Sequence, residues 1–261
     1  MCLLILAWCA HPRYRLIVAA NRDEYHDRAA APLAPWPAPD ELLAGRDLRA
    51  GGTWLGIDRA RRFGVITNYR DLHQSAPGAP SRGGLILEYL RGARGPGEYL
   101  RALEPRAALF GGFNLLLADG QSLWYASNRA QPFARQLQPG IYGLANELLD
   151  APWPKVVRVR RSFERWLRES AAPATPATLL ALLDDRRPAD EHDGVLAHTG
   201  PPGWTRALSA PFVEHREFGT RCSTAVLLEP DGALQIAERR FDRSGHYAGQ
   251  SEYDLQAGQW C

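Results

Sequence analysis

The sequence predicts an α+β sandwich of one domain over residues 1–261, because of how strand and helix patterns are distributed along it. Paired apolar runs typical of strands stand near both ends of the chain, and helical patterns are grouped between them. The chain is 45% hydrophobic and 23% charged, which is enough apolar material to bury a full core. This composition excludes a disordered chain.

The first two strands are predicted at Leu3–Ala10 and Leu16–Ala20, on either side of a His-Pro-Arg break. No Lys or Arg precedes the first run, which is unlike a secretory signal. The run is also too short to span a bilayer. We therefore expect an opening hairpin and no integral membrane segment.

Further elements are predicted from turn residues and from periodicity. Strand pairs are expected at 51–58 with 63–69, on either side of Asp119-Gly120, and on either side of Pro230-Asp231-Gly232, with a single strand in GIYGLAN. Helices are expected in RGGLILEYLRG, in WPKVVRVRRSFERWLRES and in TPATLLALLDD, where Thr175 is a candidate N-cap before Pro176. The Pro-rich stretches at 32–39 and 76–80 are interpreted as loops.

The charge and cysteine content exclude several classes of function. A net charge of +2 does not predict a nucleic-acid partner. The four cysteines lie far apart, without a CxxC pair or zinc spacing, so neither a disulfide framework nor a metal site is expected and a reducing, cytoplasmic location is favoured. The basic residues are nearly all arginine, and Lys155, the only lysine, is interpreted as a consequence of compositional bias. The arginine-rich face of the 153–170 helix is interpreted as solvated, with phosphate or acidic-lipid binding as the alternative.

Cys2 is the first candidate for chemistry, because it directly follows Met1. Removal of Met1 would leave a thiol and a free α-amino group on one Cα. An α-amine has an ordinary pKa of about 7.7–8.0, so it can act as the base for its own side chain. The alternative is an inert cysteine near a chain end.

Asn21-Arg22-Asp23-Glu24, called here the NRDE segment, follows the second apolar run. In a hairpin that turns near Pro12, the end of the second strand returns beside the start of the first. Asp23 is therefore expected next to Cys2, where its carboxylate can hold the α-ammonium group or orient the amine. The alternative is a strand that ends in solvent.

Several short segments occur together and in order: Cys2, the NRDE segment, GGTWLGI, TNY, GLAN and FGTRCSTAV. In this set the chain resembles the NRDE family, also called the transport and Golgi organisation protein 2 family. That family in turn resembles N-terminal-nucleophile (Ntn) hydrolases of the choloylglycine hydrolase and penicillin V acylase type. The resemblance implies a four-layer αββα sandwich, with two antiparallel sheets between helical layers.

The resemblance also implies roles for individual residues. Cys2 corresponds to the nucleophile, Asp23 to the aspartate near the α-amine, and Arg221 to a late active-site arginine; Arg22 of the NRDE segment is a further candidate. Asn68 and Asn146 correspond to oxyanion-hole donors, although each is also typical of a turn or a strand end. The acylase arginine three residues before the aspartate is replaced here by Ala20.

Two residues outside this set receive weaker assignments. Trp54 is expected to pack over the core or at the mouth of a pocket, and it is a substrate-binding candidate. Asn114 is expected to be structural. No GxxxxGK[ST] or GxGxxG pattern accompanies the Gly51-Gly52 pair, so nucleotide phosphate binding at that pair is not predicted.

Two functions follow from the sequence. The first is a cysteine hydrolase that cleaves a linear, non-peptide amide or a related acyl bond through an acyl group on Cys2, with no cofactor. The second, implied by the association of eukaryotic family members with lipid and heme handling, is a non-enzymatic carrier of a hydrophobic ligand. For heme, the candidate ligands are His11, Cys2 and Cys9. The expected ligand is a small acyl-amide or lipid-like molecule, and the oligomeric state is not predicted.

Overall fold

The structure, a computed structural model, describes residues 3–70, 78–169, 174–189 and 204–261. Within these ranges the chain forms two antiparallel sheets and groups into two units, each built on one sheet. Unit 1 comprises Met1–Asp27, Gly140–Ala145 and Asp150–Gly258, and unit 2 comprises Arg28–Pro139, Asn146–Leu149 and Gln259–Cys261. The predicted α+β class with two antiparallel sheets is confirmed. The single-domain assignment stays a prediction.

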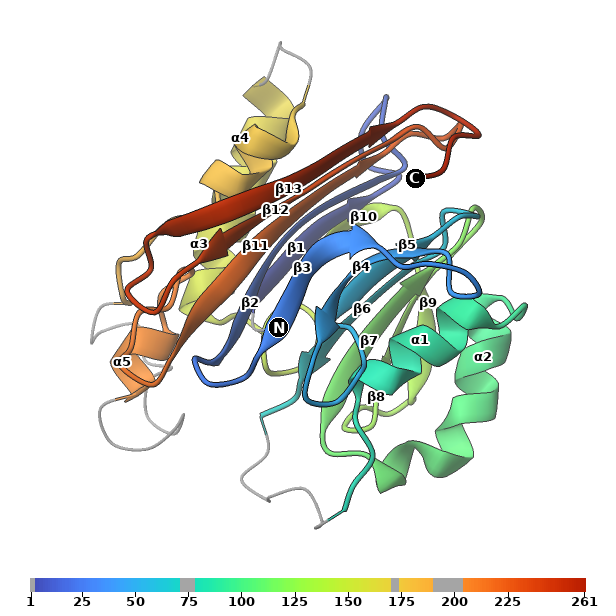
Figure 1. The fold of residues 1–261 in the computed structure, drawn as a ribbon, viewed down its shortest axis with the longest axis horizontal. Coiled ribbons are helices and arrows are strands. Elements are labelled where there is room, and N and C mark those ends of the chain that lie inside the picture. Colours follow the sequence, from blue (N-terminus) through green and yellow to red (C-terminus); the bar gives the residue numbers. More distant parts are fainter. Residues whose placement is uncertain (1–2, 71–77, 170–173, 190–203) are drawn as a thin grey trace. The chain divides into compact units, whose positions relative to one another are not determined.

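The sheet of unit 1 has six strands in the order β10-β1-β2-β11-β12-β13 (Figure 1). Helix α3 contacts β1 and β10, while α4 contacts β2, β11 and β12. The elements are β1 (Leu3–Trp8), β2 (Leu16–Tyr25), β10 (Gly140–Leu144), α3 (Pro154–Glu169), α4 (Pro176–Ala181), α5 (Trp204–Leu208), β11 (Phe218–Leu228), β12 (Leu234–Phe241) and β13 (Tyr247–Leu255).

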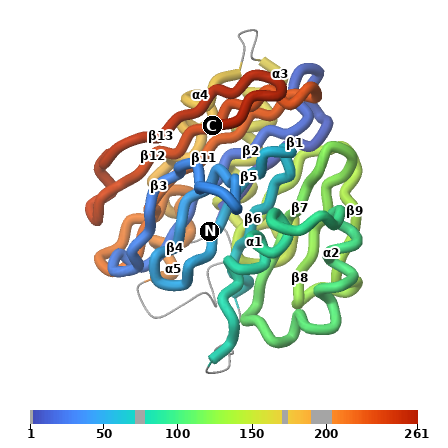
Figure 2. The backbone as a smooth tube through the Cα atoms, turned by 45° about the vertical axis from the view of Figure 1, so that its right-hand side comes forward, coloured from blue at the N-terminus to red at the C-terminus, as the bar shows by residue number. Residues whose placement is uncertain are grey.

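The sheet of unit 2 has seven strands that follow one another in sequence order (Figure 2). Helix α1 contacts β5 and β6, and α2 contacts β8 and β9. The elements are β3 (Ala30–Pro35), β4 (Leu42–Asp47), β5 (Leu55–Asp58), β6 (Phe63–Asn68), α1 (Gly83–Arg91), α2 (Pro96–Leu103), the 3₁₀ helix η1 (Glu104–Leu109), β7 (Phe113–Ala118), β8 (Leu123–Ser127) and β9 (Ala134–Leu137).

Helix α3 packs on the sheet of unit 1 through one apolar stripe. Val156, Val159 and Phe163 are buried in a core cluster that also contains Leu3 and Ile5 of β1. These spacings of three and four residues place the stripe on one side of the helix and leave the arginines largely on the other. Helix α4 begins where predicted, because Thr175 Oγ1 accepts a hydrogen bond from the Thr178 amide in a capping box.

One expectation about extended structure was wrong, and the alternative of a strand that ends in solvent is excluded. The Pro-rich stretch at 32–39 is not all loop, because β3 runs to Pro35 at the edge of its sheet, where a missing amide donor is tolerated. The NRDE segment does not end its strand in solvent; β2 continues through it to Tyr25. No helix in the described ranges combines the length and the apolar character needed to cross a membrane.

Candidate functional site

The NRDE segment lies inside β2, between two neighbouring strands. On one side Leu3 of β1 pairs with Asn21, and on the other Thr220 of β11 pairs with Asp23. Strand β11 pairs with β2 along its whole length, from Leu16 to Tyr25, and satisfies the backbone groups of the polar residues. Pairing with β11 is why four polar residues continue a strand that the sequence pattern ends at Ala20.

Asp23 is 2% exposed and is held through one of its oxygens by Thr220. Thr220 Oγ1 accepts a hydrogen bond from the Val213 amide (2.9 Å), so its own hydroxyl hydrogen is directed to Asp23 Oδ1 (2.7 Å). The preceding residue must be small, because a Cβ on Gly219 would lie 2.9 Å from the Val213 carbonyl oxygen. The FGTRCSTAV segment thus orients the Asp23 carboxylate.

Lys155 faces the same carboxylate from the first turn of α3. Its Nζ lies 3.9 Å from Asp23 Oδ2 and 5.9 Å from the centre of the Trp153 ring, and the side chains of Lys155 and Asp23 are 1% and 0% exposed. A lysine is almost never fully buried unless it is paired with an opposite charge. Lys155 was not among the predicted site residues, although its being the only lysine in an arginine-rich chain was a usable signal.

Asn21 and Asp23 lie on the face of β2 that carries the helices. Ala19 and Ile17, two and four residues before Asn21, belong to the core cluster under α3 and α4. The Asn21 amide donates to the Leu183 carbonyl (3.2 Å) and to the Pro211 carbonyl (2.9 Å), and Ser223 Oγ donates to Asn21 Oδ1 (2.6 Å). Asn21 is therefore a structural residue, which fixes the strand beside Asp23.

Arg22 and Arg221 also lie at this end of the sheet. Arg22 is 3% exposed, projects to the face opposite Asp23, and lies 3.8 Å from Glu24 Oε2. Arg221 occupies a register irregularity in β11 and donates from Nη1 to the His26 carbonyl (2.8 Å). Burial, followed by the positive charge of Arg22, lowers the pKa of Arg221. The structure thus places Arg22, Asp23 and Arg221 at the same end of the sheet, with Arg22 and Asp23 on opposite faces.

The cysteines differ in accessibility. Cys2 and its relation to Asp23 lie outside the described residues, and Leu3, which follows Cys2, is the first residue seen in β1. Cys222 pairs with Arg22 and is buried, and burial followed by the charge of Glu238 raises the pKa of its thiol well above the ordinary value. Cys9 and Cys261 are exposed.

The predicted oxyanion donors Asn68 and Asn146 both belong to unit 2 and contact each other. Asn146 Nδ2 donates to the Asn68 carbonyl (3.0 Å), and the Arg70 amide donates to the Asn146 carbonyl (2.6 Å). Asn114 is fully buried, donates to Thr67 Oγ1 and to the Glu147 carbonyl, and accepts from the Tyr125 hydroxyl. These contacts agree with the structural role expected for Asn114.

Trp54 is 6% exposed, and its ring lies against Gly45 of β4. A Cβ at Gly45 would stand 2.3 Å from the Trp54 ring, so the glycine makes room for the indole. Within unit 2 the side chain packs as a core residue, and its substrate-binding role stays a prediction.

Of the residues considered as heme ligands, His11 and Cys9 lie in the β1–β2 connection, and Cys2 lies outside the described residues. His11 Nδ1 accepts hydrogen bonds from the Arg13 and Tyr14 amides, and burial followed by the charge of Arg13 lowers its pKa. Among the residues that the structure describes, no group of three or more His, Cys, Asp or Glu is placed to hold a metal ion. Heme binding stays a prediction.

The sequence that forms this site is similar to those of known proteins. The family model described as transport and Golgi organisation 2 matches residues 1–243. This chain belongs to the transport and Golgi organisation 2 family. The Mus musculus transport and Golgi organization 2 homolog is 32% identical over 277 residues, which cover 98% of this chain and 100% of the mouse protein. The Bos taurus homolog is 35% identical, covering 92% of each chain, and the Drosophila melanogaster protein is 26% identical, covering 91% of each.

A solved structure described as a Caenorhabditis elegans N-acylethanolamine-hydrolyzing acid amidase ortholog overlaps with 88% of this chain and 93% of its own. The TM-score is 0.49 and the identity 10%, a level that carries no argument about activity. Membership of the transport and Golgi organisation 2 family rests on the sequence matches, and it confirms the resemblance found in the sequence.

Proposed function

We propose that this member of the transport and Golgi organisation 2 family is an N-terminal-cysteine hydrolase that cleaves a linear, non-peptide amide or a related acyl bond. The observation that carries the proposal is the buried, oriented carboxylate of Asp23 on the strand beside β1. An ordinary strand end needs neither a buried carboxylate nor contacts that hold it. The Asp23 carboxylate has both, because it lies between Thr220 and Lys155. Such a group is typical of a functional site.

In the proposed reaction, Met1 is removed and the α-amino group of Cys2 takes the proton of the Cys2 thiol. The thiolate attacks the carbonyl carbon of the substrate, and the tetrahedral intermediate collapses as the leaving amine takes a proton from the α-ammonium group. This leaves a thioester on Cys2. Water, losing a proton to the α-amine, hydrolyses the thioester to a carboxylic acid and restores the thiol.

The roles proposed for the other residues follow from their charges. The Asp23 carboxylate attracts the α-ammonium group that forms in each half-reaction, and Lys155 keeps that carboxylate in place as a positioning residue. Arg221 is proposed to bind a carboxylate or carbonyl of the substrate, with Arg22 adding positive potential. Asn68 and Asn146 remain the proposed oxyanion donors on the basis of the acylase resemblance.

The first test is intact-protein mass spectrometry during brief treatment with iodoacetamide, on a Cys9→Ala/Cys261→Ala protein. These substitutions remove the two exposed competing thiols, and the buried Cys222 is expected not to react. We expect loss of Met1 and one rapid label on Cys2, with a rate that rises through neutral pH. Adding Cys2→Ala should abolish the label.

Matched substitutions then test Asp23. Asp23→Asn should shift the pH profile of labelling, whereas Asp27→Asn, a change at an exposed carboxylate four residues away, should not. Release of amine from a panel of N-acyl amides, absent in Cys2→Ala, would establish the activity. Retention of Met1, or labelling of Cys2 no faster than that of an unfolded cysteine peptide, would refute the mechanism and leave the ligand-carrier hypothesis.

A further inference from the structure

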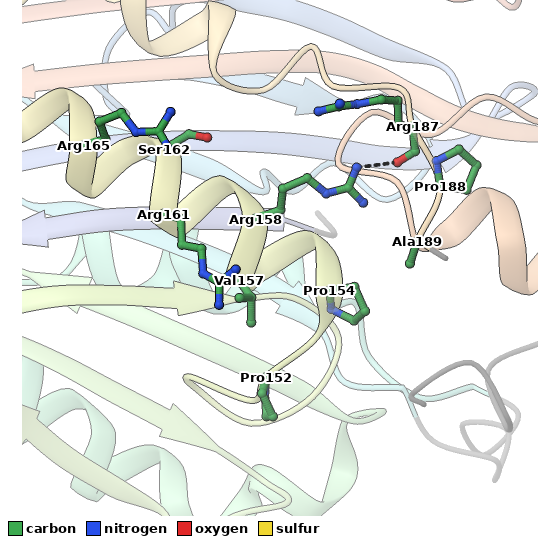
Figure 3. A pocket seen from close by; sticks show the side chains of 10 residues that line it. All are labelled: Pro152, Pro154, Val157, Arg158, Arg161, Ser162, Arg165, Arg187, Pro188 and Ala189. Atoms are coloured by element: carbon green, nitrogen blue, oxygen red, sulfur yellow. Dashed lines mark hydrogen bonds between the residues drawn. The ribbon is translucent and has the colours of Figure 1, made fainter. Parts of the chain in front are cut away.

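A second candidate site lies in unit 1 between α3 and the segment that follows α4 (Figure 3). It is a cavity of about 600 Å³, within the range of about 300–1,000 Å³ of small-molecule sites. Four of its ten lining residues are arginines, Arg158, Arg161, Arg165 and Arg187, and none is acidic. None of the ten belongs to the proposed hydrolase machinery.

Two of the arginines, Arg158 and Arg187, are held by Asp185, which is not itself a lining residue. Arg158 Nη1 lies 3.2 Å from Asp185 Oδ2 and donates to the Arg187 carbonyl at 2.8 Å, the bond drawn in Figure 3. Arg187 donates to both carboxylate oxygens of Asp185, at 3.0 and 2.9 Å. The hydrogen bonds from Arg187 are the main reason why the pKa of Asp185 falls to about 2. This wall of the cavity is therefore pre-organised.

The other two arginines, Arg161 and Arg165, have a different environment. Both are exposed, and neither has a hydrogen bond or an ion pair with a residue of the described part of the chain. They stand four residues apart on α3, a spacing at which like charges repel each other and destabilise a helix. Arg158 lies three residues before Arg161 on the same side. A bound anion would remove this repulsion.

The net charge of the wall indicates what kind of anion fits. Four arginines against the single carboxylate of Asp185 leave 4 − 1 = 3 positive charges, more than one carboxylate group balances. Planar guanidinium groups match phosphate oxygens with two parallel hydrogen bonds, and Ser162 adds a hydroxyl donor. A concave wall favours a soluble molecule over a flat membrane surface.

We propose that this cavity binds a small soluble ligand that carries two or more linked phosphate groups. Arg161 and Arg165 provide the uncompensated charges, and Arg158, Arg187 and Ser162 form the wall that orients the phosphates. From the sequence, phosphate binding by this helix face was only the alternative to a solvated face, because periodicity does not show that a second segment forms a cavity with it.

The test is isothermal titration of the full chain with inorganic pyrophosphate and, separately, with orthophosphate at low ionic strength. We expect one saturable site for pyrophosphate, with a higher affinity than for orthophosphate.

Arg161→Gln/Arg165→Gln should weaken pyrophosphate binding by about tenfold or more, as expected for the loss of charge-assisted hydrogen bonds. The control, Arg49→Gln/Arg101→Gln, removes the same charge from two exposed arginines of unit 2 and should bind as the wild type does. Thermal unfolding verifies that both variants fold.

Three results would overturn the proposal. If both double variants weakened pyrophosphate binding equally, the net charge of the protein alone would attract the anion. If orthophosphate bound as tightly as pyrophosphate, the site would not require linked phosphate groups. Binding to phosphatidic-acid vesicles without saturable pyrophosphate binding would identify a membrane surface instead. Pyrophosphate binding can be measured equally well in the Cys2→Ala variant, which lacks the proposed nucleophile. A failure of pyrophosphate binding is therefore distinguishable from a failure of the proposed hydrolase.

Discussion

Asp23 and Lys155 form a charge pair that is almost entirely removed from solvent, with 0% and 1% of their side chains exposed. Removing one partner of such a pair leaves a buried charge without compensation, which destabilises proteins by about 3–5 kcal/mol. Replacing both partners leaves no isolated charge. The two residues therefore depend on each other energetically, and a double-mutant cycle can measure that coupling.

We expect Lys155→Met to lower the free energy of unfolding by about 3 kcal/mol, because Asp23 then loses the positive charge of Lys155. Urea unfolding at neutral pH measures the change. The double variant Asp23→Asn/Lys155→Met should be more stable than Lys155→Met alone. Additive effects of the two single substitutions would show that the pair is not coupled.

At the scale of elements, Asn21 joins β2 to two segments that are distant in sequence. Its amide donates to the carbonyl of Leu183, just after α4, and to the carbonyl of Pro211, just after α5. These two bonds fix both segments relative to the strand that carries Asp23. A single buried amide thus supports three elements.

Asn21→Ala should therefore cost about 3 kcal/mol of unfolding free energy, because two buried carbonyls and the Ser223 hydroxyl each lose a partner. Ser223→Ala is the matched control: it removes only the bond to Asn21 Oδ1 and should cost about 1 kcal/mol. Urea unfolding of the two variants gives both values. Equal losses would contradict the proposed role of the two carbonyl contacts.

Asp185 joins α3 to the segment after α4 by pairing with Arg158 and Arg187. Its pKa of about 2 in the folded protein is below the ordinary 3.8, so the ionised form stabilises the fold above about pH 4. That stability is lost as the pH falls from about 4 towards 2.

We therefore expect Asp185→Asn to lower the urea midpoint at pH 7. The difference from the wild type should shrink as the pH falls from about 4 towards 2, where the wild-type carboxyl also becomes neutral. A difference that stays constant over this range would mean that the carboxylate charge contributes nothing.

At the scale of the whole molecule, neither unit is one continuous stretch of chain. The chain passes between the units after residues 27, 139, 145, 149 and 258. Strand β10, which completes the sheet of unit 1, directly follows the segment that ends the sheet of unit 2. Residues 146–149 return to unit 2, where Asn114 and Tyr125 bond to Glu147 and Leu149.

This connectivity predicts one cooperative thermal transition, in agreement with the single-domain expectation. In differential scanning calorimetry the calorimetric and van 't Hoff enthalpies should agree. Phe163→Ala, in the core of unit 1, should shift the whole transition to lower temperature, with a loss of about 3–5 kcal/mol. Two resolved transitions, of which only one moves, would show instead that the units unfold independently.

Much of the local structure was predictable because it depends on neighbours in sequence. The periodicity of residues 153–170 predicted α3, Thr175 before Pro176 predicted the start of α4, and Asp119-Gly120 predicted the β7–β8 hairpin. Strand β3 was missed because its prolines are typical of loops. The ordered motifs predicted the family and named Asp23, Arg22 and Arg221 as candidates.

The sequence by itself thus determined the hairpin at the start of the chain, the α+β class, the family and the residue types available for chemistry, since these depend on local patterns and recognisable motifs. Only the tertiary structure decided that β2 continues through the NRDE segment, that Thr220 and Lys155 enclose Asp23, and that the arginines of α3 line a cavity. Asp23 and Thr220 are 197 positions apart, and such a contact exists only because pairing of β2 with β11 satisfies the backbone hydrogen bonds of both strands.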